Sequence, residues 1–217
     1  LNVALGLSLA AGLPLVLVPE FRPAAAIAAI AAHQVAVIAG VPAMYAAFLA
    51  LDEETAPAAA FASVRIAVSG GSSLPPRVAV AMATRFGVHL EEGYGLTETS
   101  PVVTTTVGTV DAVPGSVGVA LPGVEVRVVD DDGEDTLVGD PGEVWVRGAN
   151  VFPGYWNDAT ATARVLTPSG WLRTGDLGVL DDAGALTLVD RAKDLVIVSG
   201  YNVFPAEVEA ALADHPE

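Results

Sequence analysis

Residues 64–85 read VRIAVSGGSSLPPRVAVAMATR: an apolar run, a turn of serine and glycine, and a segment that opens with two prolines. We predict a buried strand over Val64–Val68 and a helix over Pro75–Arg85, because proline suits the first turn of a helix, where its missing N–H has no partner to lose. A strand that leads through a short turn into a helix is the repeating unit of α/β proteins. This stretch therefore predicts the fold class of the N-terminal half.

The same strand–helix alternation extends in both directions from this stretch. Three more short strands and three more helices are predicted over Leu15–Val18, Val35–Ala39 and Val88–Leu90, and over Asn2–Ala11, Pro23–Ala32 and Pro42–Leu51, respectively. Strands that alternate with helices pair in parallel and are covered by those helices. We therefore predict an α/β subdomain over residues 1–108, with a mostly parallel sheet and flanking helices.

Residues 109–190 have a different texture, with short strands between turns of Gly, Asp and Pro. Val124–Val129 and Glu143–Arg147 alternate apolar with polar side chains, as half-buried strands do. Trp171–Leu180 and Leu186–Arg191 flank an Asp- and Gly-containing turn and predict a hairpin. We predict a small antiparallel, β-barrel-like subdomain here.

Residues 191–217 predict a strand, a glycine turn and a helix that begins near Pro205. We expect this segment to be a hinge and the start of a further domain. The first residue is not Met, and we expect the chain to be part of a longer protein.

Composition narrows the classes of function. The 217 residues carry 10 basic and 26 acidic side chains, a formal net charge of −16, with no basic cluster, so nucleic acid is not an expected partner. The absence of cysteine excludes disulfides and thiolate metal sites and fits a cytoplasmic protein. The apolar residues 1–19 are interrupted by Gly12 and Pro14, so we predict a buried helix and strand there and no transmembrane segment.

The turn Ser69-Gly70-Gly71-Ser72-Ser73 is the first candidate site. Open α/β sheets bind ligands at the carboxyl ends of their strands, and glycines let a ligand approach the backbone closely. A tight turn that simply needs glycine explains the same residues, and taken alone the segment favours that interpretation.

The segment Glu92–Pro101, which reads EGYGLTETSP, is the second candidate. Glycines flank Tyr94 and should leave its aromatic face open on a mobile backbone. Thr97 and Glu98 place a hydroxyl beside a carboxylate, which suits a phosphate and a hard divalent cation. Packing alone gives little reason for so many polar groups after a buried strand, so this loop favours a functional interpretation.

The segment Gly93–Thr99 resembles the signature loop of adenylate-forming enzymes, the superfamily of acyl-CoA synthetases, peptide-synthetase adenylation domains and luciferases. Further blocks of that superfamily are matched in the expected order by Gly142–Gly148 with Gly154–Trp156, by Gly170–Asp176, and by Asp190–Asp194 with Ser199–Glu209. Four motifs in order are far more specific than one.

The resemblance implies an adenine site in the first half of the chain. Gly70, Gly71 and Ser72 would lie beside the adenine, and Tyr94, followed by Gly95, would stack on its ring.

The resemblance also implies roles for five further residues, four at the nucleotide and one at a hinge. Thr97 would hydrogen-bond a phosphate oxygen, and Glu98 would help to hold Mg²⁺. Asp176 would accept hydrogen bonds from both ribose hydroxyls, with Arg191 also reaching the ribose. Lys193 would be the hinge for a rotating C-terminal domain.

Simpler interpretations of the later residues stay open at this point. Asp176 could merely stabilise a turn, Arg191 could pair with Asp190 or Asp194 on the surface, and Lys193 beside Asp194 could be a solvated pair.

The implied reaction uses ATP, Mg²⁺ and coenzyme A to activate a carboxylic acid, a fatty acid above all, and to form its CoA thioester. The superfamily's lysine-containing phosphate loop and its C-terminal catalytic lysine are not in these residues, so we expect residues 1–217 alone to be inactive. Two other hypotheses are a peptide-synthetase adenylation domain, which usually has Pro where Leu96 stands, and a non-catalytic AMP-binding fragment.

Overall fold

The computed structural model describes residues 2–109, 113, 115–191, 196–198, 201–203, 205, 208 and 211–212. The chain divides into two compact units, the first Leu1–Gly95 with Thr105–Val110 and the second Leu96–Thr104 with Asp111–Glu217. Each unit is described by itself.

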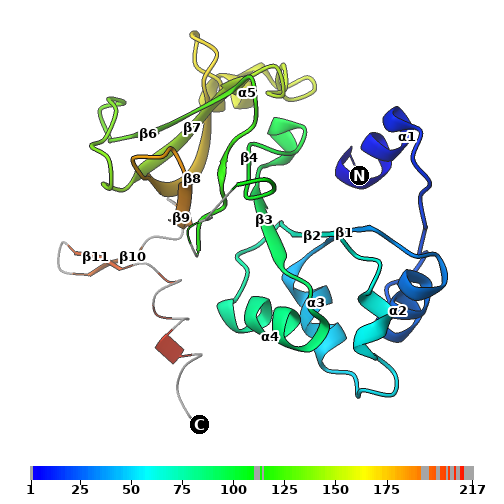
Figure 1. Ribbon diagram of the computed structural model, residues 1–217. Helices are drawn as coiled ribbons and strands as arrows, with labels where there is room; N and C mark the ends of the chain where they lie inside the picture. The colour runs from blue at the N-terminus through cyan, green and yellow to red at the C-terminus, as the bar shows by residue number, and fades with distance from the viewer. Residues whose placement is uncertain are drawn as a thin grey trace. The chain divides into compact units, whose positions relative to one another are not determined.

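The first unit is built on three parallel strands, β1 (Val37–Gly40), β2 (Ile66–Ser69) and β3 (Leu90–Tyr94). β2 pairs with β1 on one side and with β3 on the other. Its helices are α2 (Pro23–Ala32), α3 (Pro42–Leu49) and α4 (Pro76–Phe86), with a 3₁₀ turn, η2 (Ala58–Phe61). Each of these three α-helices begins with proline in its first turn, and the predicted α/β architecture is confirmed (Figure 1).

The core of this unit lies between the strands and the three helices. Tyr45, Phe48, Phe61 and Met82 are almost completely buried there. The ring of Phe48 packs edge-on against those of Tyr45 and Phe61, at centroid distances of 6.3 and 5.8 Å. Such tilted contacts between aromatic rings stabilise a core beyond the area that they bury.

One polar contact ties this core to the end of β2. The hydroxyl of buried Tyr45 donates a hydrogen bond of 2.7 Å to the carbonyl of Val68, next to the Ser69–Ser73 turn. Gly40 makes room for the phenol, because a Cβ there would stand 3.2 Å from the ring. Tyr45 thus helps to hold the strand end from which the first candidate loop begins.

We predict that Tyr45→Phe lowers the free energy of unfolding by about 1–2 kcal/mol, because it removes a buried hydrogen bond while keeping the ring. Urea denaturation followed by circular dichroism measures the change. A variant as stable as the original chain would show that this bond contributes nothing.

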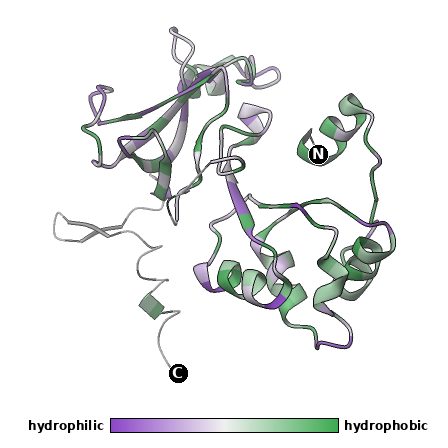
Figure 2. Cartoon of the chain, viewed as in Figure 1, coloured by the Kyte–Doolittle hydropathy of each residue, from purple (hydrophilic) through white to green (hydrophobic). Residues whose placement is uncertain are grey.

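The N-terminal segment differs from the prediction. Residues 2–11 are helical, as a π-helix, η1 (Asn2–Gly6), followed by α1 (Leu7–Ala11), but Leu15–Val18 is not a strand. Leu9 and Leu17 are 70% and 74% exposed, so the predicted burial is also wrong. Figure 2 shows that the helical segment at the N-terminus is hydrophobic. This segment is apolar, as a buried segment would be, but the other described residues do not cover its side chains. No helix in the described ranges is long and apolar enough to cross a bilayer.

The second unit centres on a four-stranded antiparallel sheet in the order β6 (Val124–Val129), β7 (Gly142–Gly148), β8 (Leu172–Leu180) and β9 (Leu186–Arg191). The predicted β8–β9 hairpin is confirmed. The barrel-like form is not, because β6 and β9 do not pair and four strands are too few to close. The other elements of this unit are η3 (Thr97–Thr99), β5 (Val119–Ala120), α5 (Ala159–Val165), β10 (Val196–Val198) and β11 (Tyr201–Val203). The two-residue strand β4 (Thr104–Thr105) has one residue in each unit.

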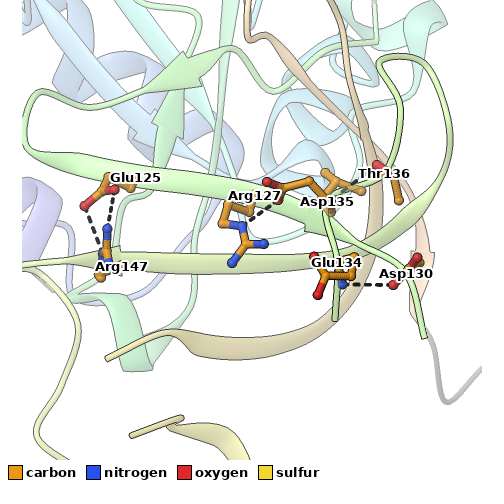
Figure 3. Close-up of polar contacts among 8 residues, drawn as sticks. Glu125, Arg127, Asp130, Glu134, Asp135, Thr136 and Arg147 are labelled. Carbon is orange, nitrogen blue, oxygen red and sulfur yellow. Dashed lines mark hydrogen bonds and ion pairs between the residues drawn. The ribbon is translucent and has the colours of Figure 1, made fainter. Parts of the chain in front are cut away.

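The two faces of this sheet are chemically distinct. Val144, Val146 and Leu172 are buried on one face. On the other, the guanidinium of Arg147 lies 4.5 Å from the ring centroid of Trp171 and also pairs with Glu125 on the neighbouring strand. Figure 3 shows this pair and the similar pair of Arg127 with Asp135. One face therefore buries aliphatic side chains, and the other combines buried tryptophans, Trp145 and Trp171, with charged residues.

Candidate functional site

The Thr-Gly-Asp segment of β8 forms a bulge with two extra residues. Trp145 pairs with Arg173 and Glu143 with Leu177, so the three residues Thr174–Asp176 lie opposite the single residue Val144. Bulges of this kind re-aim side chains and are common beside active sites.

Side chains hold the bulge in place. The Thr174 hydroxyl donates to the carbonyl of Val144 at 2.7 Å and accepts from the amide of Asp176 at 3.1 Å. One carboxylate oxygen of Glu143 accepts from the amide of Gly175 and the other from the indole of Trp145. Gly175 has φ +74°, a conformation that glycine adopts without strain. The backbone around Asp176 is therefore fixed from several directions.

Asp176 stands opposite Arg191 across the β8–β9 pair. Its carboxylate Oδ1 lies 3.4 Å from Arg191 Nε, and the residue is 9% exposed, whereas the Arg191 side chain is 60% exposed. The backbone amide of Arg191 donates to Asp190. The structure thus brings Asp176 and Arg191 together on the two neighbouring strands of the hairpin.

The loop after β3 contributes a second carboxylate to this unit. Thr97 and Glu98 form η3; Thr97 is exposed and Glu98 is half-buried. The Tyr155 hydroxyl donates a hydrogen bond of 2.7 Å to Glu98 Oε1. This bond raises the pKa of the Tyr155 phenol. Glu98 and Tyr155 also line a small cavity of about 50 Å³, together with Leu96, Val165, Leu172, Arg173 and Thr174.

This loop fits a magnesium ion that is held mainly by phosphates. In the described part of the chain no three acidic, histidine or cysteine side chains converge on one point, so a cage made only of protein ligands is not formed there. Mg²⁺ commonly binds through one or two carboxylates together with substrate phosphates. Glu98 provides one such carboxylate, with Oε1 bound to Tyr155.

The first unit holds the other candidate loop. Gly71 has φ +83°, and both Gly71 and Ser72 are exposed beyond the end of β2. A Cβ on Gly70 would lie 3.4 Å from the carbonyl oxygen of Gly93, so this turn runs beside the end of β3. Tyr94 is only 8% exposed, so the predicted open aromatic face is wrong: β3 continues through Tyr94 and packs its ring.

Beside this loop, Glu92 is half-buried at the position that pairs with Ser69. Burial raises the pKa of the Glu92 carboxyl, an effect that a hydrogen bond from the Leu74 backbone only partly offsets. The folded state therefore holds the Glu92 proton to a higher pH than the unfolded chain does. Its contribution to stability is fully present below the unfolded pKa of about 4.3 and is lost as the pH rises through the folded pKa.

We predict that Glu92→Gln becomes progressively more stable than the original chain between pH 4 and pH 7, since glutamine accepts the same hydrogen bond and never ionises. Thermal unfolding of both proteins at several pH values measures the difference in Tm. A difference that is constant over this range would contradict the account.

The contacts of two site residues, Tyr155 and Arg191, could not be found by sequence reasoning. Tyr155 lies 57 residues after Glu98, and no spacing rule joins them. The register that places Arg191 opposite Asp176 depends on an irregularity at Val189 in β9, which alternation does not reveal. Gly95 is exposed in the loop between β3 and η3. Lys193, the predicted hinge, lies outside the described residues.

Comparison with known proteins shows to which family the chain belongs. A profile of the AMP-binding enzyme family matches residues 1–156. The chain belongs to this family. It is 47% identical over 155 residues to a long-chain-fatty-acid–CoA ligase of Yersinia pestis, covering 71% of this chain and 27% of that protein. It is 38% identical over 212 residues to an indoleacetate–CoA ligase of Aromatoleum aromaticum, covering 97% of this chain and 41% of that protein.

A solved structure within the family matches both units. ATP-bound MatB from Rhodopseudomonas palustris is 35% identical to the chain, with a TM-score of 0.89 over 99% of this chain and 42% of that protein. The chain thus spans between about a quarter and two fifths of the length of these relatives.

Proposed function

We propose that this chain carries part of the ATP site of an AMP-forming acyl-CoA ligase that activates a carboxylic acid, foremost a fatty acid. The single observation that carries the proposal is the bulge that fixes Asp176 beside Arg191. A nearly buried carboxylate on a rigid strand can accept two hydroxyl donors at once, as the ribose diol of a nucleotide presents them. The ligase names of the relatives support the same activity.

Each candidate residue then has a role in binding the nucleotide. Asp176 accepts the ribose hydroxyls, and Arg191 offers a cation at the same edge. The Gly70–Ser72 turn and Tyr94, with Gly95, border the adenine. The overall negative charge of the chain does not oppose this, because backbone amides, an arginine and a metal ion supply local positive potential.

The first step of the proposed reaction joins the acid to AMP. A carboxylate oxygen of the substrate attacks the α-phosphorus of ATP, the bond from that phosphorus to the bridging oxygen breaks, and pyrophosphate leaves with the electron pair. The Thr97 hydroxyl donates a hydrogen bond to a phosphate oxygen, and the Glu98 carboxylate would be a ligand of Mg²⁺. When bound, the ion offsets charge on the phosphates. Positioning supplies most of the acceleration.

The second step transfers the acyl group. The thiol sulfur of coenzyme A attacks the acyl carbon, the bond from that carbon to the AMP oxygen breaks, and the thiol proton leaves to solvent. In this proposal Lys193 is the hinge, within the segment 191–217, for a rearrangement between the two steps. ATP and a reduced thiol are both available in the cytoplasm that the lack of cysteine predicts.

Arylacetic acids are a second candidate substrate class. The indoleacetate–CoA ligase covers nearly the whole chain at 38% identity, so the family relationship alone does not select an aliphatic acid. A panel of substrates separates the two classes.

The test uses the full-length protein encoded by the gene, since we propose that residues 1–217 alone do not turn over. ATP–pyrophosphate exchange is measured with fatty, aryl and amino acids, followed by assay of CoA thioesters. Exchange with a fatty acid and formation of its thioester support the proposal. Exchange with amino acids only, or no exchange with any acid, would overturn it.

We predict that Asp176→Asn lowers kcat/KM for ATP by about 100-fold, because it weakens two charge-assisted hydrogen bonds to the ribose. Asp182→Asn is the matched control, an exposed aspartate in the turn of the same hairpin. Steady-state kinetics compare the two variants, with thermal unfolding to establish that both are folded. Equal kinetics in the two variants would remove Asp176 from the nucleotide site.

A further inference from the structure

We propose that Tyr155 is a positioning residue for Glu98: its hydroxyl holds one carboxylate oxygen so that the other is presented to the metal ion of the nucleotide complex. This inference rests on the proposed function, which assigns Glu98 to the metal. It adds a residue that acts through Glu98 and does not itself touch the substrate.

The direct contact is the hydrogen bond of 2.7 Å from the Tyr155 hydroxyl to Glu98 Oε1. A carboxylate with one oxygen held by a donor has a defined rotation about its last bond, so its second oxygen, Oε2, has a defined direction. Ligating carboxylates are commonly oriented in this way by hydrogen-bond donors around them. The arrangement of Glu98 and Tyr155 is therefore that of a metal ligand and the hydrogen-bond donor that orients it.

A second contact attaches the same segment to the backbone of Glu98. The amide of Phe152 donates to the Glu98 carbonyl at 2.8 Å. The rings of Phe152 and Tyr155 then pack edge-on with centroids 4.9 Å apart. Glu98 is thus held at both its main chain and its side chain by a segment of four residues.

The start of α5 in turn fixes Tyr155. Its amide donates to the Thr162 hydroxyl at 2.9 Å, and that hydroxyl donates to the carbonyl of Asp158, the residue that caps the helix. Gly154 has φ +140°, and a Cβ there would come within 2.7 Å of Thr162. Only glycine permits this close turn. The backbone that carries Tyr155 is therefore held rigidly, although Tyr155 is 38% exposed.

The bond has the polarity that the role needs. The Tyr155 hydroxyl is the donor in this bond, and a phenol carries no charge at neutral pH. A neutral donor leaves the negative charge of Glu98 available to a cation. A lysine at this position would compete for that charge.

The test measures metal binding and not turnover. Mn²⁺ replaces Mg²⁺, and its affinity for the full-length protein is followed by water proton relaxation in the presence of α,β-methylene-ATP. Tyr155→Phe keeps the ring and its packing on Phe152 while removing the hydroxyl. Trp156→Phe is the matched control, because this neighbouring side chain is 92% exposed. Glu98→Gln tests the ligand itself.

We expect Mn²⁺ affinity to fall about tenfold in Tyr155→Phe, at least as far in Glu98→Gln, and not at all in Trp156→Phe. AMP affinity without metal should be the same in all four proteins, which a general loosening of the fold would not produce. If Glu98→Gln weakens the metal and Tyr155→Phe does not, the role of Tyr155 is overturned alone. If Glu98→Gln has no effect, the metal assignment in the proposed function fails, and the role of Tyr155 fails with it.

Discussion

Burial of the valines on one face of β7 is the constraint on which the second unit depends. Val144 and Val146 are completely buried, and a slip of one residue would turn both to the charged face. Their burial therefore determines the register of β7 with its two neighbours. Gly178 adds to this constraint, since a Cβ there would come within 2.9 Å of Val144 and of Leu186 on β9.

The position of Asp176 results from an interruption of the regular β7–β8 register. Because the pairing is fixed on both sides of Val144, the three residues Thr174–Asp176 opposite it must bulge, and Thr174 and Glu143 supply the hydrogen bonds that hold them. Asp176 consequently has a rigid backbone on a strand and does not rely on a loop. A carboxylate prepared in this way needs little further ordering when a ligand arrives, which lowers the entropic cost of binding.

Sequence patterns predicted the regular elements well, for a local reason. Proline in the first turn marked α2, α3 and α4, and strict alternation marked β6 and the core of β7, because these signals depend only on neighbouring residues. Leu15–Val18 had the composition of a buried strand, but a strand also needs a partner, which composition does not show. The open form of the sheet likewise depended on whether its edge strands meet.

The candidate site, too, could be predicted from the sequence only in part. The Thr-Gly-Asp and Gly-Tyr-Gly motifs were visible in the chain, and the resemblance gave their residues roles. The contacts between motifs were not visible, because Glu98–Tyr155 and Asp176–Arg191 join segments that are distant in sequence. Such pairs arise from register and from turns such as the one at Gly154. They are properties of the folded chain, and they decide which polar side chains converge.

The central claim, that these motifs together bind a nucleotide, is tested most directly by hydrogen–deuterium exchange of the full-length protein with and without AMP. The account predicts slower exchange on AMP binding in peptides that cover residues 69–73, 93–98 and 174–176, with little change over the exposed turn at residues 130–135. Protection that avoids all three motif segments, or AMP binding that protects only other parts of the chain, would contradict it.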